Sequence, residues 1–218
     1  SPPHLSPGLP LRITEELAIR IFKSQIMLFF LMIRRPPRST LAPYASLCRS
    51  RADPSMILDV NPGELFVIRN VANLVPPYEV DGAYHGTSAA LEFAVEGLHI
   101  KDIIVMGHAR CGGIHALYEN APKGHKKGFV GQWMNIATEL ALFIRRQYAH
   151  ETPEQQRDRL ERESVLASID RLKTFPFVEA ALKEGRLRLH AWFFDIGNGI
   201  LLEYDEKAED YRPVDLPG

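Results

Sequence analysis

The stretch Ile103-Ile-Val-Met-Gly-His-Ala-Arg-Cys-Gly-Gly-Ile-His115 decides the fold that the sequence predicts. Its apolar residues run without interruption into Gly107, which is typical of a strand buried on both faces of a parallel sheet. His108 and Cys111 follow this strand, and Gly112-Gly113 opens a segment of helical character. In α/β sheets, side chains at the carboxyl end of a strand and the start of the next helix form binding and catalytic sites.

Histidine and cysteine are the two side chains that zinc prefers as ligands. A lone His-x-x-Cys pattern occurs more often in packed cores than in metal sites. The buried strand before the pair and the two glycines after it reverse that balance here. We therefore predict that His108 and Cys111 are ligands of Zn²⁺.

Composition limits the class of protein. A chain of 218 residues with 45% hydrophobic content can build one domain with a sizeable core, with two small domains as the alternative. A net charge of −1 gives no field that attracts nucleic acid or an anionic membrane. The two cysteines, Cys48 and Cys111, are too few for a disulfide framework and fit a reducing compartment.

No signal-peptide pattern is recognisable, and the apolar run at residues 26–33 is too short to span a bilayer. We expect a cytoplasmic protein without a nucleic-acid or membrane partner.

Strand and helix patterns alternate along the chain. The apolar run 26–33 and residues 65–68, 187–194 and 200–204 predict strands, while residues 13–22, 87–95, 128–150 and 151–172 predict helices. This alternation predicts an α/β fold with a central, mostly parallel sheet and helices on both faces.

One stretch does not fit the rest of the chain. Residues 29–41, continuing to residue 50, resemble the conceptual translation of a sequencing-adapter fragment. We therefore hypothesise that about residues 27–50 are not native to the gene; the alternative is a divergent hydrophobic N-terminus. The expected organisation is an atypical, partly foreign-looking N-terminal arm at residues 1–49 and an α/β domain at residues 50–218.

Several stretches together resemble the β-class carbonic anhydrases. They are Ser50-Arg-Ala-Asp-Pro54, residues 62–78, residues 86–92, Gly107-His-Ala-Arg-Cys-Gly-Gly113, residues 174–177 and residues 190–196. The match covers about residues 50–205, with the motifs in family order. It implies a four-stranded parallel sheet with an antiparallel edge strand, a homodimer or higher homo-oligomer, and one zinc per subunit. The implied activity is that of a carbonate dehydratase, a lyase that reversibly hydrates carbon dioxide to bicarbonate.

The resemblance also assigns roles around the zinc. His108 and Cys111 match two of the family's three ligands, and the third begins the pattern Cys-x-Asp-x-Arg. Arg51 matches the Arg, which holds the Asp, but Leu47 and Arg49 stand at the Cys and Asp positions. The resemblance therefore predicts an impaired enzyme. Cys48 is the alternative ligand, although residues 47, 49 and 51 of a strand share one face and Cys48 faces away without a bulge.

Three further positions follow from the resemblance. Gly112 matches the residue whose backbone amide contacts substrate, and Phe66 matches an aromatic that lines the pocket from the partner subunit. Phe93 stands where some members have Tyr, which removes a hydroxyl and keeps the ring.

Two alternatives to a working enzyme remain open. The first is a non-catalytic, metal-poor dimeric scaffold or defective chimera of the same fold. The second is a thiol enzyme that uses Cys48 beside Arg49 and Arg51. Structural roles are expected elsewhere: a hydrogen bond for Asp195, core packing for Trp192, and a solvated helix face for the charged residues 151–163.

Overall fold

The computed structural model describes residues 26–30, 54–58, 65–81, 83–124 and 128–214. The helix predicted at residues 13–22 lies outside these ranges, as do Leu47, Cys48, Arg49 and Arg51.

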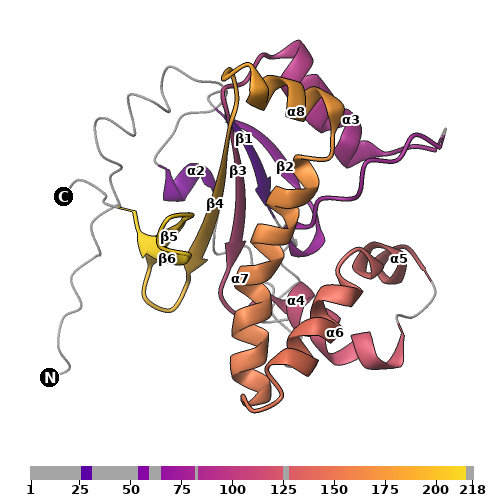
Figure 1. The fold of residues 1–218 in the computed structure, drawn as a ribbon, viewed down its shortest axis with the longest axis vertical. Coiled ribbons are helices and arrows are strands. Elements are labelled where there is room, and N and C mark those ends of the chain that lie inside the picture. Colours follow the sequence, from indigo (N-terminus) through magenta and orange to yellow (C-terminus); the bar gives the residue numbers. More distant parts are fainter. Residues whose placement is uncertain (1–25, 31–53, 59–64, 82, 125–127, 215–218) are drawn as a thin grey trace, which may run out of the picture.

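A sheet of six strands, in the order β2-β1-β3-β4-β5-β6, forms the centre of the molecule (Figure 1). The strands are β1 (Ile26–Phe30), β2 (Leu65–Arg69), β3 (Asp102–His108), β4 (Arg188–Asp195), β5 (Ile200–Asp205) and β6 (Asp210–Pro213). β1 pairs in parallel with β2 and with β3, and β3 pairs in parallel with β4. β5 and β6 complete the sheet as antiparallel strands. The predicted α/β class with a mostly parallel sheet is confirmed.

Two strands of the sheet go beyond the prediction. Residues 26–30, which the sequence assigned to an atypical arm, supply the strand between β2 and β3. The second antiparallel strand, β6, was not predicted, because its short polar sequence Asp-Tyr-Arg-Pro has no apolar alternation.

Helices lie on both faces of the sheet (Figure 1). They are α2 (Pro54–Ile57), α3 (Gly86–Glu92) continued by a π-helix (Phe93–Gly97), α4 (Gly112–Asn120), α5 (Phe129–Asn135), α6 (Thr138–Gln147), α7 (Pro153–Leu172) and α8 (Pro176–Lys183). Short 3₁₀ turns occur at Val71–Asn73 and Ala121–Lys123. Within the described ranges, no helix combines the length and the apolar character that crossing a lipid bilayer requires.

β3 is buried along its whole length. Ile103 and Val105 face the core that contains Val165 of α7, whereas Ile104 and Met106 face the core that contains Ile57 of α2. Because successive side chains of a strand point to opposite faces, a strand covered on both sides needs apolar residues at every position. The uninterrupted apolar run before Gly107 meets this need.

The helix predicted at residues 128–150 is wrong in one respect, because it is two helices rather than one. α5 ends before Ile136, and Ala137 leaves the helical conformation with φ −117° and ψ 13°. The amides of Ile136 and Ala137 donate to the carbonyls three residues earlier, at Trp133 and Met134. These tighter bonds turn the chain before α6 begins.

α7 begins where local sequence signals place it. Thr152 caps the helix by accepting a hydrogen bond from the Gln155 amide, and the Gln155 side chain accepts one from the Thr152 amide. Pro153 occupies the first helical position, where it has no amide to leave unpaired. α7 then runs along one face of the sheet toward α8 (Figure 1).

Candidate metal centre

β3 and α4 bring the two predicted ligands to one short loop at the carboxyl edge of the sheet. His108 is the last residue of β3, and Cys111 is the N-terminal cap of α4. The intervening Ala109 is fixed to the neighbouring strand, because its amide donates to the Phe194 carbonyl at 3.0 Å. Both side chains are buried, with 5% of His108 and 1% of Cys111 exposed. This is the strand–loop–helix arrangement that the sequence predicts.

The His108 ring is oriented by its own loop. Its Nδ1 lies 2.9 Å from the carbonyl oxygen of Ala109, so this nitrogen carries the proton and donates. Because Nδ1 donates, Nε2 is the ring nitrogen that a metal would bind. A neutral imidazole nitrogen and a cysteine sulfur form a donor set that suits zinc.

The described residues supply only part of a zinc site. Within the described ranges, no group of three or more His, Cys, Asp and Glu side chains is arranged to hold a metal ion. The remaining candidates, Cys48 and the positions of Leu47, Arg49 and Arg51, lie outside those ranges. The donor set of His108 and Cys111 therefore fits zinc in chemistry but needs a further ligand to complete it.

The loop between the two ligands has a strained backbone. Arg110 has φ 58°, in the left-handed region that side chains with a Cβ rarely adopt. The amide of Arg110 and that of the next residue converge on one carboxylate from α7. The Arg110 amide donates to Glu161 Oε2 at 3.0 Å, and the Cys111 amide donates to Oε1 at 2.6 Å. Such strain persists where neighbouring groups fix the backbone, and it is common at functional sites.

Glu161 is a buried carboxylate, with 5% of the residue exposed. Burial raises the pKa of Glu161 to about 7, while the two backbone hydrogen bonds and the nearby His108 act to lower it. The prediction that residues 151–163 form a solvated helix face is wrong for Glu161 and for Gln156, which is also buried. One signal in the sequence was available: Glu161 precedes Val165 by four residues, which places it on the apolar face of the helix.

α7 holds the neighbouring loop in the same way. After β2, Ala72 and Asn73 adopt positive φ values of 65° and 47°. Ser168 donates to the Asn73 carbonyl at 3.0 Å and accepts from the Val75 amide at 3.3 Å. The Asn73 side chain donates to Ser164 at 3.4 Å. One face of α7 therefore fixes the loops that follow both β2 and β3.

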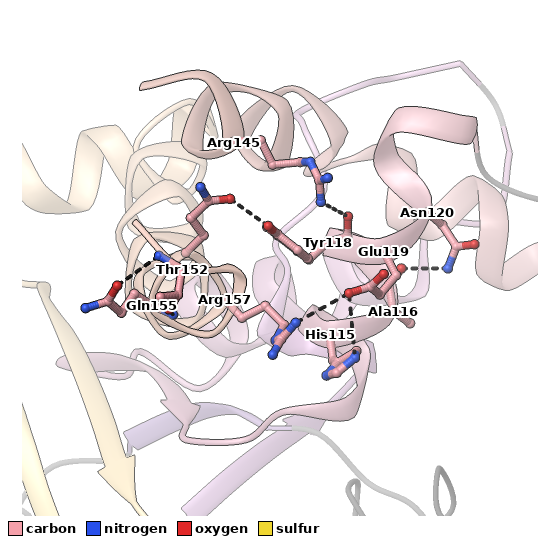
Figure 2. Close-up of polar contacts among 10 residues, drawn as sticks. His115, Ala116, Tyr118, Glu119, Asn120, Arg145, Thr152, Gln155 and Arg157 are labelled. Carbon is pink, nitrogen blue, oxygen red and sulfur yellow. Dashed lines mark hydrogen bonds and ion pairs between the residues drawn. The ribbon is translucent and has the colours of Figure 1, made fainter. Parts of the chain in front are cut away.

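We call residues 108–111, which carry the two predicted ligands, the ligand loop. α4 is also bonded to its neighbours away from this loop (Figure 2). The Tyr118 hydroxyl donates to Gln156 Oε1 of α7 at 2.6 Å, and Glu119 pairs with Arg157 at 3.4 Å. Arg145 of α6 donates to the Tyr118 carbonyl at 3.3 Å, and its guanidinium lies 4.3 Å from the centre of the Tyr118 ring. The C-terminal turn of α4 is thus fixed to α7.

Two other predicted positions lie at the same edge. Gly112 is the first residue of α4, and the first amides of a helix have no acceptor within it. Asp195 ends β4 and accepts hydrogen bonds from the amides of Gly197 and Asn198 at 2.9 and 3.2 Å. The structural role predicted for Asp195 is confirmed, as is the core packing of Trp192, which is 1% exposed.

The two predicted pocket aromatics pair with each other, at a distance from His108. The rings of Phe66 and Phe93 are 6.0 Å apart between centroids. In the register of the sheet, Phe66 is opposite Met27 of β1, and Met27 is opposite Ile103 of β3. Ile103 comes five residues before His108 in β3, which is a distance of roughly 16 Å along the strand at about 3.3 Å per residue. Within one chain, these aromatics therefore do not surround the two ligands.

Comparison with known proteins places the chain among carbonic anhydrases. A family model described as carbonic anhydrase matches residues 46–201. Beta carbonic anhydrase 5 of Arabidopsis thaliana, a chloroplastic protein, is 36% identical over 146 residues, which are 67% of this chain and 48% of that protein. A carbonic anhydrase of Pseudomonas aeruginosa is 36% identical over 180 residues, 83% of this chain and 76% of the relative. The chain spans between about half and two thirds of the length of the first three curated relatives that it matches.

A solved structure agrees with this assignment. The β-carbonic anhydrase CcaA superimposes with a TM-score of 0.71 and 29% sequence identity, over 92% of this chain and 83% of that one.

Proposed function

The chain belongs to the β-class carbonic anhydrases, and from this premise we propose that its site serves the reversible hydration of carbon dioxide to bicarbonate. We further propose that the chain as written performs this reaction poorly or not at all. The observation that carries the first proposal is the buried pair His108 and Cys111 on one loop at the carboxyl end of β3.

In this proposal, Nε2 of His108 and the sulfur of Cys111 would be two of the ligands that hold a zinc ion. A zinc ion at such a site would lower the pKa of a bound water to about 7 and so supply a nucleophile at neutral pH. The chain's own contribution is to orient the donors: the Ala109 carbonyl fixes the His108 ring, and the Glu161 carboxylate fixes the backbone of Cys111. The Gly112 amide, at the start of α4, is the expected contact for a substrate oxygen.

The proposed defect concerns residues 47–51. In the family pattern, Leu47 occupies the position of the third zinc ligand, and its side chain has no donor atom. Arg49 occupies the position of the Asp, so that a positively charged guanidinium would repel the divalent zinc ion. Arg51 keeps the family's Arg but loses the Asp that it would hold. Cys48 would supply the ligand only through a bulge that turns its sulfur to the other face.

We also propose that residues 27–50 are foreign to the gene, and that β1 then substitutes for the family's own strand at that place in the sheet. Their resemblance to an adapter translation supports this. Reading the coding DNA across this region from an independent clone tests it, and an unchanged sequence there refutes it.

The proposed assembly is a homodimer or a higher homo-oligomer, in which Phe66 lines the pocket of the partner subunit. Two observations support it: the Phe66–Phe93 pair lies far from His108 of its own chain, and Phe93 is 55% exposed.

Zinc content tests the function most directly. The chain is purified, dialysed against a mild chelator and subjected to elemental analysis. We expect essentially no zinc in the chain as written, and about one zinc per chain after Leu47→Cys with Arg49→Asp. The double substitution is also expected to raise carbon dioxide hydration. If hydration does not rise although zinc is bound, our account of the defect is wrong.

The competing function is a metal-poor scaffold of the same fold. It predicts that the double-substituted chain binds no zinc either and remains inactive, with the fold and the oligomer intact. The thiol-enzyme alternative predicts that Cys48→Ser abolishes whatever activity the chain as written has.

A further inference from the structure

We propose that Glu161 is the positioning residue of the metal site, acting through the backbone of Arg110 and Cys111 rather than by contact with the metal or the substrate. The inference rests on the proposed function, because it assigns the two ligands to His108 and Cys111. It adds Glu161 of α7, which lies 50 residues after Cys111 in the sequence.

The hydrogen bonds of Glu161 are specific for a carboxylate. Each of its two oxygens accepts from a different amide, Oε2 from Arg110 at 3.0 Å and Oε1 from Cys111 at 2.6 Å. A carboxylate has two acceptor oxygens, whereas a glutamine has one acceptor and an NH₂ group that would oppose the second amide. The pair of bonds is therefore selective for Glu over Gln at this position.

The burial of Glu161 needs an explanation. A buried carboxylate without partners is costly, and such groups are normally paired with a cation or a metal. In the part of the chain that the structure describes, neither oxygen of Glu161 pairs with a lysine or arginine side chain. Its charge is balanced by amides of the ligand loop. A backbone contact of this kind positions a loop.

The loop requires such an anchor. Arg110 is held at φ 58°, a conformation that costs a residue with a Cβ free energy unless its surroundings enforce it. This left-handed residue stands between His108, the last residue of β3, and Cys111, the N-terminal cap of α4. Loss of the anchor would let Arg110 return to an ordinary conformation and would move Cys111 relative to His108.

α7 is suited to provide the anchor because α4 is attached to it at several points. The bonds Tyr118–Gln156 and Glu119–Arg157 fix the C-terminal turn of α4 to α7 (Figure 2). Glu161 adds the attachment at the N-terminal end of α4, where Cys111 lies. The position of the sulfur is therefore set by α7 and by the end of β3.

The first test needs no metal. Amide hydrogen exchange is measured at Arg110 and Cys111 in the chain as written, together with the rate at which a thiol reagent labels Cys111, read by mass spectrometry of its peptide. We expect Glu161→Gln to speed both processes by about 10-fold or more, the effect of losing one hydrogen bond to a charged group, and Glu161→Ala to speed them further.

Glu163→Gln is the matched control. It makes the same chemical change on the same helix, at a half-buried residue two positions away, and is expected to leave both rates unchanged. Urea dependence separates a local effect from general destabilisation, because opening of the loop alone exposes little surface and is insensitive to urea. Unchanged rates in Glu161→Gln, or rates that rise only in proportion to global unfolding, would overturn the proposal.

The second test reports on the ligand geometry itself. In the Leu47→Cys, Arg49→Asp chain loaded with Co²⁺, the thiolate-to-cobalt charge-transfer band is recorded. Glu161→Gln is expected to shift or weaken this band, and Glu163→Gln to leave it unchanged. An unaltered band in Glu161→Gln contradicts the proposal.

The outcomes are separable from those of the proposed function. The metal-free rates respond to Glu161 whether or not the chain hydrates carbon dioxide. Absence of zinc and activity in the repaired chain would defeat the proposed function alone. Unaltered loop exchange would defeat the positioning role alone.

Discussion

Val165 of α7 lies directly against Gly107 of β3, one residue before His108. A Cβ built at Gly107 would stand 2.6 Å from Cγ2 of Val165, closer than real Cβ contacts come. The glycine therefore permits the close approach of helix and strand that brings Glu161, one turn earlier in α7, to the ligand loop. Gly107 serves packing here and needs no unusual backbone angle.

Gly107→Ala is expected to destabilise the protein by about 1–3 kcal/mol, because the added methyl group over-packs a fully buried contact. Urea unfolding of the purified chain measures the loss. Gly86→Ala is the matched control, since no atom lies within 4 Å of the Cβ position there. Equal effects of the two substitutions would show that the contact with Val165 is not the cause.

Val165→Ala offers a second check on the same contact. Alone, it removes two buried methyl groups and is expected to destabilise the chain. Combined with Gly107→Ala, it removes the group that the new methyl meets, so the double variant should be less destabilised than the sum of the single ones. Additive effects in this double-mutant cycle would contradict the assigned contact.

The contrast between Gly107 and Glu161 shows what the sequence could predict. The β3–loop–α4 unit was predictable because its signals are local: an apolar run, a ligand pair and two glycines within one stretch. Helical spacing could place Glu161 on the apolar face of α7, but it could not identify the partners of its carboxylate. These are backbone amides of a loop some 50 positions earlier in the chain, which no local pattern reveals.

The interruption between α5 and α6 was missed for a related reason. Residues 128–150 keep helical spacing throughout, and no proline or glycine stands at Ile136 and Ala137. The turn follows from packing, since Met134, Ala137 and Ala141 are all buried in one core with α4. Periodicity alone does not reveal where tertiary contacts bend a helix.

Stability should depend on pH through His190. Its Nε2 lies 3.0 Å from Asp102, and its Nδ1 lies 2.8 Å from Glu203. Arg188 also binds Asp102, at 2.7 Å. Burial by itself lowers the pKa of His190, but the hydrogen bonds to the two carboxylates and their charges raise it to about 9. Both ring nitrogens therefore donate, and the ring is an imidazolium at neutral pH.

A histidine whose pKa is raised on folding contributes stability that is complete below its unfolded pKa of about 6.5 and is lost as the pH rises through 9. We expect the free energy of unfolding lost in His190→Gln to be on the order of 1–3 kcal/mol at pH 6 and to shrink toward pH 10. Urea unfolding at several pH values measures this difference. A loss that does not vary between pH 6 and 10 would show that the charge on His190 is unimportant.

Ser168 should be important for the loop after β2. Its hydroxyl is fully buried and serves both the Asn73 carbonyl and the Val75 amide. Ser168→Ala leaves both backbone groups without this partner and is expected to cost about 1–3 kcal/mol in thermal or urea unfolding. Ser164→Ala is the comparison, because its bond from Asn73 is longer, at 3.4 Å, and its loss should cost less. The reverse order would assign the support of this loop to Ser164.

The identity of the third zinc ligand can be decided with cysteine substitutions. In the Leu47→Cys, Arg49→Asp chain, Cys111→Ser is expected to abolish stoichiometric zinc binding, while Cys48→Ser retains it. The reason is that side-chain alternation in an extended segment would place residues 47, 49 and 51 on one face and Cys48 on the other. In the chain as written, Cys48→Ser should change nothing, since two donors hold zinc weakly. If the chain as written instead carries about one zinc that Cys48→Ser removes, a bulge has turned Cys48 toward His108 and Cys111. The predicted defect would then be absent, and the site would be complete by a route that the alternation of strand side chains does not predict.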